Sequence, residues 1–204
     1  DWAETRLQEV GPGPKDSENV RAYDAALAAA PAATQLWVMI ETCTVIPRLF
    51  EVAELSATTR LSSFVMGTND LAKEMRARLL PGRTPFLPML SLTVAAARAH
   101  GLVAIDGVCN AFHDLDLLGA EAAQGVEFGF DGKSAIHPAQ VEVCNTAFSP
   151  SADEIAWAQT IVAAFDQPDA AGKGAIRVEG KMVELLHHAQ AQQILAIAAQ
   201  IGAR

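Results

Sequence analysis

The sequence has few of the residues that mark several protein classes. Its 204 residues include three cysteines, one tyrosine and 6% aromatic residues. Cys43, Cys109 and Cys144 lie far apart without a CxxC pair, so we expect reduced, buried thiols in a cytoplasmic protein. No apolar run is as long as a membrane span, and residues 1–20 do not resemble a signal peptide. These absences indicate a soluble protein.

Positive charge is also scarce. Lysine and arginine number 15 against 24 aspartates and glutamates, which gives a formal net charge of −9. Nucleic acids and anionic membranes need a basic face, so both are excluded as partners, while a local basic pocket for a small anion remains compatible. Because 50% of the residues are hydrophobic and 19% are charged, the chain has enough apolar material for a buried core.

Short apolar runs alternate with longer stretches, as in successive βα units of a parallel sheet. No GxGxxG, Walker or HExxH motif accompanies them, and this absence argues against a doubly wound nucleotide-binding fold. Acidic or polar residues follow the runs, as expected at the catalytic face of a (β/α)₈ barrel. We therefore predict an α/β fold of TIM-barrel type that lacks the first βα units. The expected strands are 36–41, 61–66, 102–107 and 126–130, with a fifth near 5–10, and the expected helices are 44–59, 69–79, 88–100 and 113–124.

A break at 148–151 divides the predicted organisation into two parts. Residues 1–148 form the partial barrel, and residues 149–204 form a small, mainly helical appendage. Ser151 and Glu154 make a capping-box signature at the start of a helix. The appendage is predicted to contain a helix over 152–165, a hairpin over 176–183 around Gly180 and a terminal helix over 184–201.

Two carboxylates, Glu41 and Asp70, follow adjacent predicted strands. Two oxygen ligands at one barrel mouth suit Mg²⁺ better than zinc, but an acid that caps a helix or pairs with a cation explains the same pattern. The backbone of Gly67, Thr68 and Asn69 offers N–H groups for a carboxylate, although an ordinary strand-to-helix turn is equally compatible. From spacing alone both interpretations stay open.

A glycine-rich segment, 129–140 (GFDGKSAIHPAQ), carries further candidates. Lys133 could meet a phosphate, and the His137-Pro138 pair fixes an extended turn. A single histidine before proline is more often structural than catalytic, so both roles remain open for His137. His187 and His188 are interpreted as solvent-facing or interface residues.

Together, several segments resemble the HpcH/HpaI aldolase superfamily, in particular its citrate lyase β-subunit-like (CitE-like) and malyl-CoA lyase branch. The resemblance extends over about residues 36–195. It rests on VMIET (38–42), MGTNDLAKEM (66–75), AAARAHGLVAIDGV (95–108), FHDLDLL (112–118), GFDGKSAIHPAQV (129–141), FSPSADEIAWA (148–158) and GKMVELLHHAQAQQIL (180–195).

The resemblance implies a (β/α)₈ barrel with a C-terminal helical lid, assembled as a homotrimer or larger homo-oligomer. It implies Mg²⁺-dependent cleavage or formation of a carbon–carbon bond in a 3-hydroxyacyl-CoA thioester, such as malyl-CoA, citramalyl-CoA or citryl-CoA, with a keto acid as the second partner. By the same resemblance, Glu41 and Asp70 are the Mg²⁺ ligands. The implied substrate-binding residues are Gly67, Thr68 and Asn69 for the keto-acid carboxylate and Ile136, His137 and Pro138 for the CoA arm.

Two departures from the family pattern bear on function. Glu184 stands where the family usually has the catalytic aspartate of the lid, so it is a working acid/base, a weakened one, or an exposed acid at a helix start. The family's first three βα units, which include a substrate-binding arginine, have no counterpart. We therefore expect these residues to oligomerise through an open sheet edge or to belong to a longer chain. The alternative functions are a non-catalytic CoA-thioester-binding or scaffolding relative, and a lyase subunit acting on an acyl-carrier-protein thioester.

Overall fold

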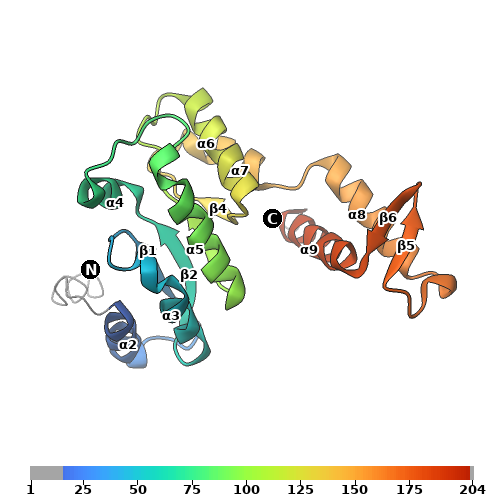
Figure 1. Cartoon of the computed structure of the whole chain (residues 1–204), viewed down its shortest axis with the longest axis horizontal. Coiled ribbons are helices and arrows are strands. Elements are labelled where there is room, and N and C mark those ends of the chain that lie inside the picture. Colours follow the sequence, from blue (N-terminus) through green and yellow to red (C-terminus); the bar gives the residue numbers. More distant parts are fainter. Residues whose placement is uncertain (1–15, 203–204) are drawn as a thin grey trace. The chain divides into compact units, whose positions relative to one another are not determined.

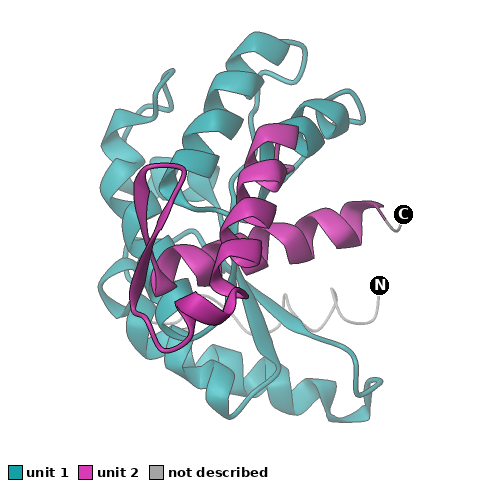
Figure 2. Ribbon diagram, turned by 90° about the vertical axis from the view of Figure 1, so that its right-hand side faces the viewer, with its two compact units in different colours: residues 1–148 teal, residues 149–204 magenta. Residues whose placement is uncertain are grey.

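A computed structural model describes residues 16–202, which form two compact units (Figures 1 and 2). The first unit ends at Phe148 and the second begins at Ser149. Within the described residues, no helix is both long and apolar enough to span a bilayer.

The first unit contains a four-stranded parallel sheet in the order β1-β2-β3-β4 (Figure 1). The strands are β1 (Leu36–Ile40), β2 (Leu61–Met66), β3 (Val103–Asp106) and β4 (Gly132–Lys133). Each strand pairs with the next one along the chain, as in a barrel segment, whereas a doubly wound sheet reverses its order at a switch point. This order confirms the expected fold of TIM-barrel type over the described strands.

Helices precede, connect and follow the four strands. The α-helices of this unit are α2 (Asp16–Ala26), α3 (Leu49–Glu54), α4 (Thr68–Met75), α5 (Leu87–Ala99), α6 (Leu115–Phe128) and α7 (Gln140–Phe148). Its 3₁₀ turns are η1 (Leu27–Ala29), η2 (Ile46–Arg48), η3 (Leu55–Ala57) and η4 (Thr84–Phe86). Pro88 lies in the first turn of α5, as expected for a residue without an N–H donor.

One face of the sheet is buried, and the other is partly exposed. Ile40, Phe64 and Ala104 point into the core and are fully buried. The alternating position on β1, Met39, is 50% exposed, and Val103 on β3 is 41% exposed. Because successive strand residues point to opposite faces, Glu41 follows β1 on the same face as Met39. The strand ends therefore present polar side chains at the margin of an exposed sheet face.

One predicted strand, 126–130, is wrong. Helix α6 continues through Phe128, despite the glycines inside it, and ends at Gly129, whose φ is 88°. The strand follows later, as β4. Asp131 therefore precedes its strand instead of following it, and its carboxylate accepts from the Ala104 N–H at 2.8 Å and pairs with Arg98 at 2.8 Å.

One expected helix is longer than the helix observed, and two helices of the structure are not predicted from the sequence. The helix expected over 44–59 is a short α3 between two 3₁₀ turns, the first of which contains a proline. Helices α2 and α7 were not predicted. The expected strand near 5–10 lies outside the described residues. Cys109 and Cys144 are buried free thiols as expected, but Cys43 is exposed because it lies in the turn after β1.

The second unit packs a hairpin against two helices. Its elements are α8 (Ala152–Phe165), η5 (Pro168–Ala170), β5 (Ala175–Val178), β6 (Lys181–Glu184) and α9 (Leu185–Gly202). The predicted capping box is present, with Ser151 and Glu154 bonding each other's backbone N–H groups. The predicted hairpin is present as well, and its turn places Glu179 at φ 48° and Gly180 at φ 81°. A small core that includes Ile161 stabilises this unit.

Candidate active site

Glu41 and Gly67 lie in contact at the carboxyl ends of β1 and β2. The parallel register pairs Ile40 with Met66, so the residues that follow them are neighbours. A Cβ atom placed on Gly67 would lie 2.4 Å from Glu41 Cβ and 2.9 Å from Glu41 Oε2. Only glycine leaves room for the glutamate here, so the shape of this strand end depends on Gly67.

The Glu41 carboxyl carries an electrostatic cost. Burial raises its pKa above the usual value, and the negative charge of Asp70 raises it further. Asp70 is the third residue of α4, where a helix start favours an acid. Among the ion pairs of residues 17–202, none involves either carboxylate. Within residues 17–202 the two carboxylates are therefore a site of negative charge without a paired cation.

This donor set fits a hard divalent cation. Carboxylate oxygens suit Mg²⁺, which keeps several waters and takes one or two carboxylates from the protein. The described residues contain no cluster of three or more histidine, cysteine, aspartate or glutamate side chains suited to a metal. A cation held by Glu41 and Asp70 would thus keep positions for water or substrate oxygens.

Gly67, Thr68 and Asn69, which are predicted to bind the keto-acid carboxylate, have different surroundings in the structure. The Gly67 N–H donates to the Ile40 carbonyl at 2.9 Å, so this donor belongs to the sheet. Thr68 is buried, and a Cβ atom on Gly107 would lie 2.8 Å from its Oγ1. Asn69 is exposed. The amide donors left at the start of α4 are those of Thr68, Asn69 and Asp70, because the first N–H groups of a helix have no partner within it.

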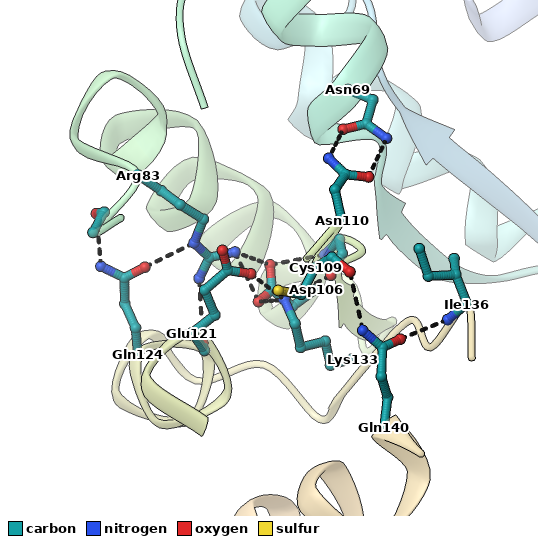
Figure 3. A network of polar contacts seen from close by, with 12 residues as sticks. Asn69, Arg83, Asp106, Cys109, Asn110, Glu121, Gln124, Lys133, Ile136 and Gln140 are labelled. Carbon is teal, nitrogen blue, oxygen red and sulfur yellow. Dashed lines mark hydrogen bonds and ion pairs between the residues drawn. The ribbon is translucent and has the colours of Figure 1, made fainter. Parts of the chain in front are cut away.

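Asn69 also makes a side-chain contact that the sequence did not predict. Its amide donates to Asn110 Oδ1 at 3.1 Å, and the Asn110 amide donates back to Asn69 Oδ1 at 2.7 Å (Figure 3). Asn110 lies in the segment 107–114 between β3 and α6, which we call the bridging loop. No local motif connects the two residues, because they are 41 positions apart.

The predicted CoA segment forms a turn before α7. The Ile136 N–H donates to Gln140 Oε1 at 2.8 Å, and His137 Nδ1 accepts from the Ala139 N–H at 3.1 Å. The His137 ring stacks on Phe112 with centroids 5.1 Å apart. Ile136 is 53% exposed. These contacts hold the His137 ring in place, and they leave the Ile136 side chain accessible.

Lys133 is not available to a phosphate, contrary to the sequence-based hypothesis. Its ammonium lies 3.1 Å from Asp106 Oδ2 and 2.7 Å from the Gly107 carbonyl, and its side chain is fully buried. Arg83 pairs with the same carboxylate at 2.7 and 2.9 Å (Figure 3). Glu121 Oε2 lies 3.1 Å from the Lys133 ammonium without hydrogen-bond geometry. We call Arg83, Asp106, Glu121 and Lys133 the buried charge cluster.

No local sequence pattern predicts the buried charge cluster. Arg83 lies in an αL conformation between α4 and α5, with φ of 50°, and precedes Asp106 by 23 positions. Asp106 lies near the end of the strand expected over 102–107, but its partners depend on tertiary packing. The charges within the cluster compensate one another, so its role is to hold the ends of β3 and β4 together.

Glu184 lies in the second unit, as the last residue of β6. Its backbone N–H donates to His187 Nδ1 at 3.0 Å, so His187 caps the start of α9 from inside the helix. His187 is half-buried rather than solvent-facing, and so is His188, whose ring contacts Phe165. Glu184 and the carboxylate pair thus belong to separate units, and their joint action is a proposal.

Comparison with known proteins identifies relatives that match most of the chain. The family model "HpcH/HpaI aldolase/citrate lyase" matches residues 7–138. A (3S)-malyl-CoA thioesterase from Cereibacter sphaeroides is 49% identical over 168 residues, which are 82% of this chain and 58% of the relative. The mitochondrial citramalyl-CoA lyase of Homo sapiens is 35% identical over 69% of this chain and 42% of the relative.

A solved structure agrees with these relatives. CitE from Mycobacterium tuberculosis, in complex with magnesium, acetoacetate and coenzyme A, matches with a TM-score of 0.71 and 26% identity, over 90% of this chain and 65% of that chain. The chain thus spans somewhat over half the length of the thioesterase relative. Its match to a family model over more than half of its residues, and its identity to the thioesterase, show that the chain belongs to the HpcH/HpaI aldolase/citrate lyase family.

Proposed function

We propose that this protein carries out the Mg²⁺-dependent cleavage, or in reverse the formation, of a carbon–carbon bond in a 3-hydroxyacyl-CoA thioester. The observation that carries the proposal is the uncompensated pair of Glu41 and Asp70 beside Gly67 at a strand end. Membership of a family with citramalyl-CoA lyase and citrate lyase β relatives supports the reaction class.

In this proposal Glu41 and Asp70 hold Mg²⁺, which neutralises their repulsion. The bound ion supplies Lewis-acid polarisation of the oxygens of the keto acid. The backbone N–H groups of Thr68 and Asn69 at the start of α4 orient its carboxylate, because a helix N-terminus favours negative charge. The thioester arm passes the turn formed by Ile136, His137 and Pro138.

Cleavage requires the 3-hydroxyl group of the substrate to lose its proton, because its oxygen becomes the carbonyl of the released keto acid. The bonding electrons of the broken carbon–carbon bond pass to the acyl thioester, whose carbon then takes up a proton. We assign that proton transfer to Glu184, in keeping with the role of an acidic residue in the family's lid. Positioned acid–base groups contribute about 10²- to 10⁴-fold to rate. The proposed assembly is a homotrimer or larger homo-oligomer, in which Glu184 reaches a neighbouring subunit's site.

Thioester hydrolysis is a second candidate, because the C. sphaeroides relative at 49% identity is a malyl-CoA thioesterase. The two reactions use the same substrate but break different bonds. Carbon–carbon cleavage of malyl-CoA yields acetyl-CoA and glyoxylate, whereas hydrolysis yields malate and free coenzyme A.

Product analysis separates these candidates. Malyl-CoA is incubated with the chain and MgCl₂, glyoxylate is measured as a hydrazone, and free coenzyme A is measured as a thiol. The lyase proposal predicts glyoxylate formation that Glu41→Gln or Asp70→Asn lowers by at least about 100-fold. Glu127→Gln, an exposed acid of α6, makes the same charge change and should leave the rate intact.

Two results would overturn the lyase proposal. Free coenzyme A without glyoxylate would establish hydrolysis. If neither cleavage nor hydrolysis products form from malyl-CoA or from citramalyl-CoA, the result would favour the non-catalytic thioester-binding relative. Glu184→Asp tests the acid/base separately: a rise in rate would show that the longer side chain is a weakened replacement, and no change with Glu184→Gln would exclude it as the base.

A further inference from the structure

Gln140 is a buried polar side chain that the proposed chemistry does not use. It is the first residue of α7 and is 0% exposed. Its Oε1 accepts from the Ile136 N–H at 2.8 Å, and its Nε2 donates to the Cys109 carbonyl at 3.0 Å (Figure 3). Burying an amide without partners is costly, so its bonds fix both the side chain and the groups it joins.

Those groups belong to two different segments. Cys109 lies in the bridging loop, whereas Ile136 begins the turn predicted to receive the CoA arm. The turn is also closed by the Gln140 N–H, which donates to the His137 carbonyl at 3.0 Å. The Gln140 side chain therefore holds the turn against the bridging loop, and the Gln140 backbone N–H closes the turn itself.

The bridging loop is itself fixed from the opposite side. Asn110, next to Cys109, makes the reciprocal amide pair with Asn69. The Lys133 ammonium donates to the Gly107 carbonyl at 2.7 Å. One loop thus connects the keto-acid segment after β2 with the thioester segment after β4, through Asn110 on one side and Gln140 on the other.

We infer that Gln140 is a positioning residue for the thioester side of the site. It holds the Ile136–Pro138 turn in the geometry that receives coenzyme A, without touching the metal side. This inference rests on the proposed function, because it takes the turn as the CoA segment. Asn110 supplies a matched control, since its side chain contacts the keto-acid segment instead.

Calorimetric titration of the full chain tests the inference with two probes, coenzyme A alone and pyruvate with MgCl₂. Gln140→Met keeps the length of the side chain and removes both hydrogen bonds. We expect the Kd for coenzyme A to rise about tenfold, while the Kd for pyruvate with MgCl₂ stays within about twofold. Asn110→Ala should show the opposite pattern. Equal weakening of both probes in Gln140→Met would indicate a merely structural role and would overturn the inference.

Hydrogen exchange of backbone amides gives a second, ligand-free readout. Gln140→Met should accelerate exchange by at least about tenfold within residues 134–139 and leave residues 67–70 unchanged. Unchanged exchange over 134–139, or acceleration throughout the first unit, would overturn the inference even if the unmodified chain bound neither probe. Failure of both probes with the unmodified chain would instead count against the proposed function, so the two failures are distinguishable.

Discussion

The two halves of the sheet treat strand-end carboxylates in opposite ways. At the end of β1, Glu41 lies beside Asp70 without a described cationic partner, and its pKa is raised by burial and by that neighbour. At the end of β3, Asp106 is fully buried but bonded to both Arg83 and Lys133. The first arrangement stores repulsion that a cation would relieve, and the second is already neutralised.

This difference indicates a ligand-binding role for the carboxylates near β1 and a structural role for the carboxylate of β3. Charges that a fold compensates internally hold elements together, and breaking one partner is costly. Charges that a fold leaves uncompensated lower stability and mark a site for a ligand. Acidic residues at the ends of two strands of one sheet thus have different roles, decided by the side chains that reach them.

The largest expected effect is the loss of Asp106. Asp106→Asn leaves the buried Arg83 and Lys133 with Glu121 as their remaining carboxylate, so we expect the free energy of unfolding to fall by about 3–5 kcal/mol. Urea denaturation at neutral pH measures this change. Glu51→Gln, which removes an exposed partner of Arg48, is the control and should change little. A loss below about 1 kcal/mol for Asp106→Asn would remove the distinction between the two strand ends.

A smaller effect is expected at Gly67. Gly67→Ala forces a methyl group against Glu41, so we expect a loss of about 1–3 kcal/mol in the free energy of unfolding. Displacing Glu41 should also weaken Mg²⁺ binding by at least about tenfold, as measured by calorimetry.

Gly119→Ala provides the matched control for that substitution. Gly119 lies inside α6, and a Cβ atom there meets nothing within 4 Å. This change should stabilise the chain by about 0.5–1 kcal/mol and leave Mg²⁺ binding unchanged. Equal effects of the two alanines would show that Gly67 has no special relation to the carboxylate pair.

The smallest expected effect is on stability as a function of pH. Because the folded-state pKa of Glu41 is raised, its ionised form destabilises the fold above that pKa. This penalty disappears as the pH falls through the raised pKa and below the unfolded value. Glu41→Gln should therefore raise the unfolding midpoint by a few degrees at pH 7 and have no effect at acidic pH. A midpoint lowered at pH 7 would indicate that Glu41 is already paired.

Parts of the fold and of the candidate site could be predicted because they depend on local sequence. The acids after the strands, the capping box of Ser151 and Glu154 and the hairpin turn at Gly180 each follow from neighbouring residues. The strand expected over 126–130 failed because its apolar residues fit a helix face equally well, and Gly129 decided where that helix ended.

The sequence by itself determined the family, the parallel βα order and the residue types at the strand ends. Only the tertiary structure decided which of those residues are free to bind. Lys133 reads as a candidate phosphate ligand in its glycine-rich segment, yet the fold buries it against Asp106. Arg83, Asn110 and Gln140 carry no local signal for their long-range contacts, because Asp106, Asn69 and Cys109 lie 23, 41 and 31 positions away from them. Charge compensation is a property of contacts in space, so it emerges only when distant segments pack together.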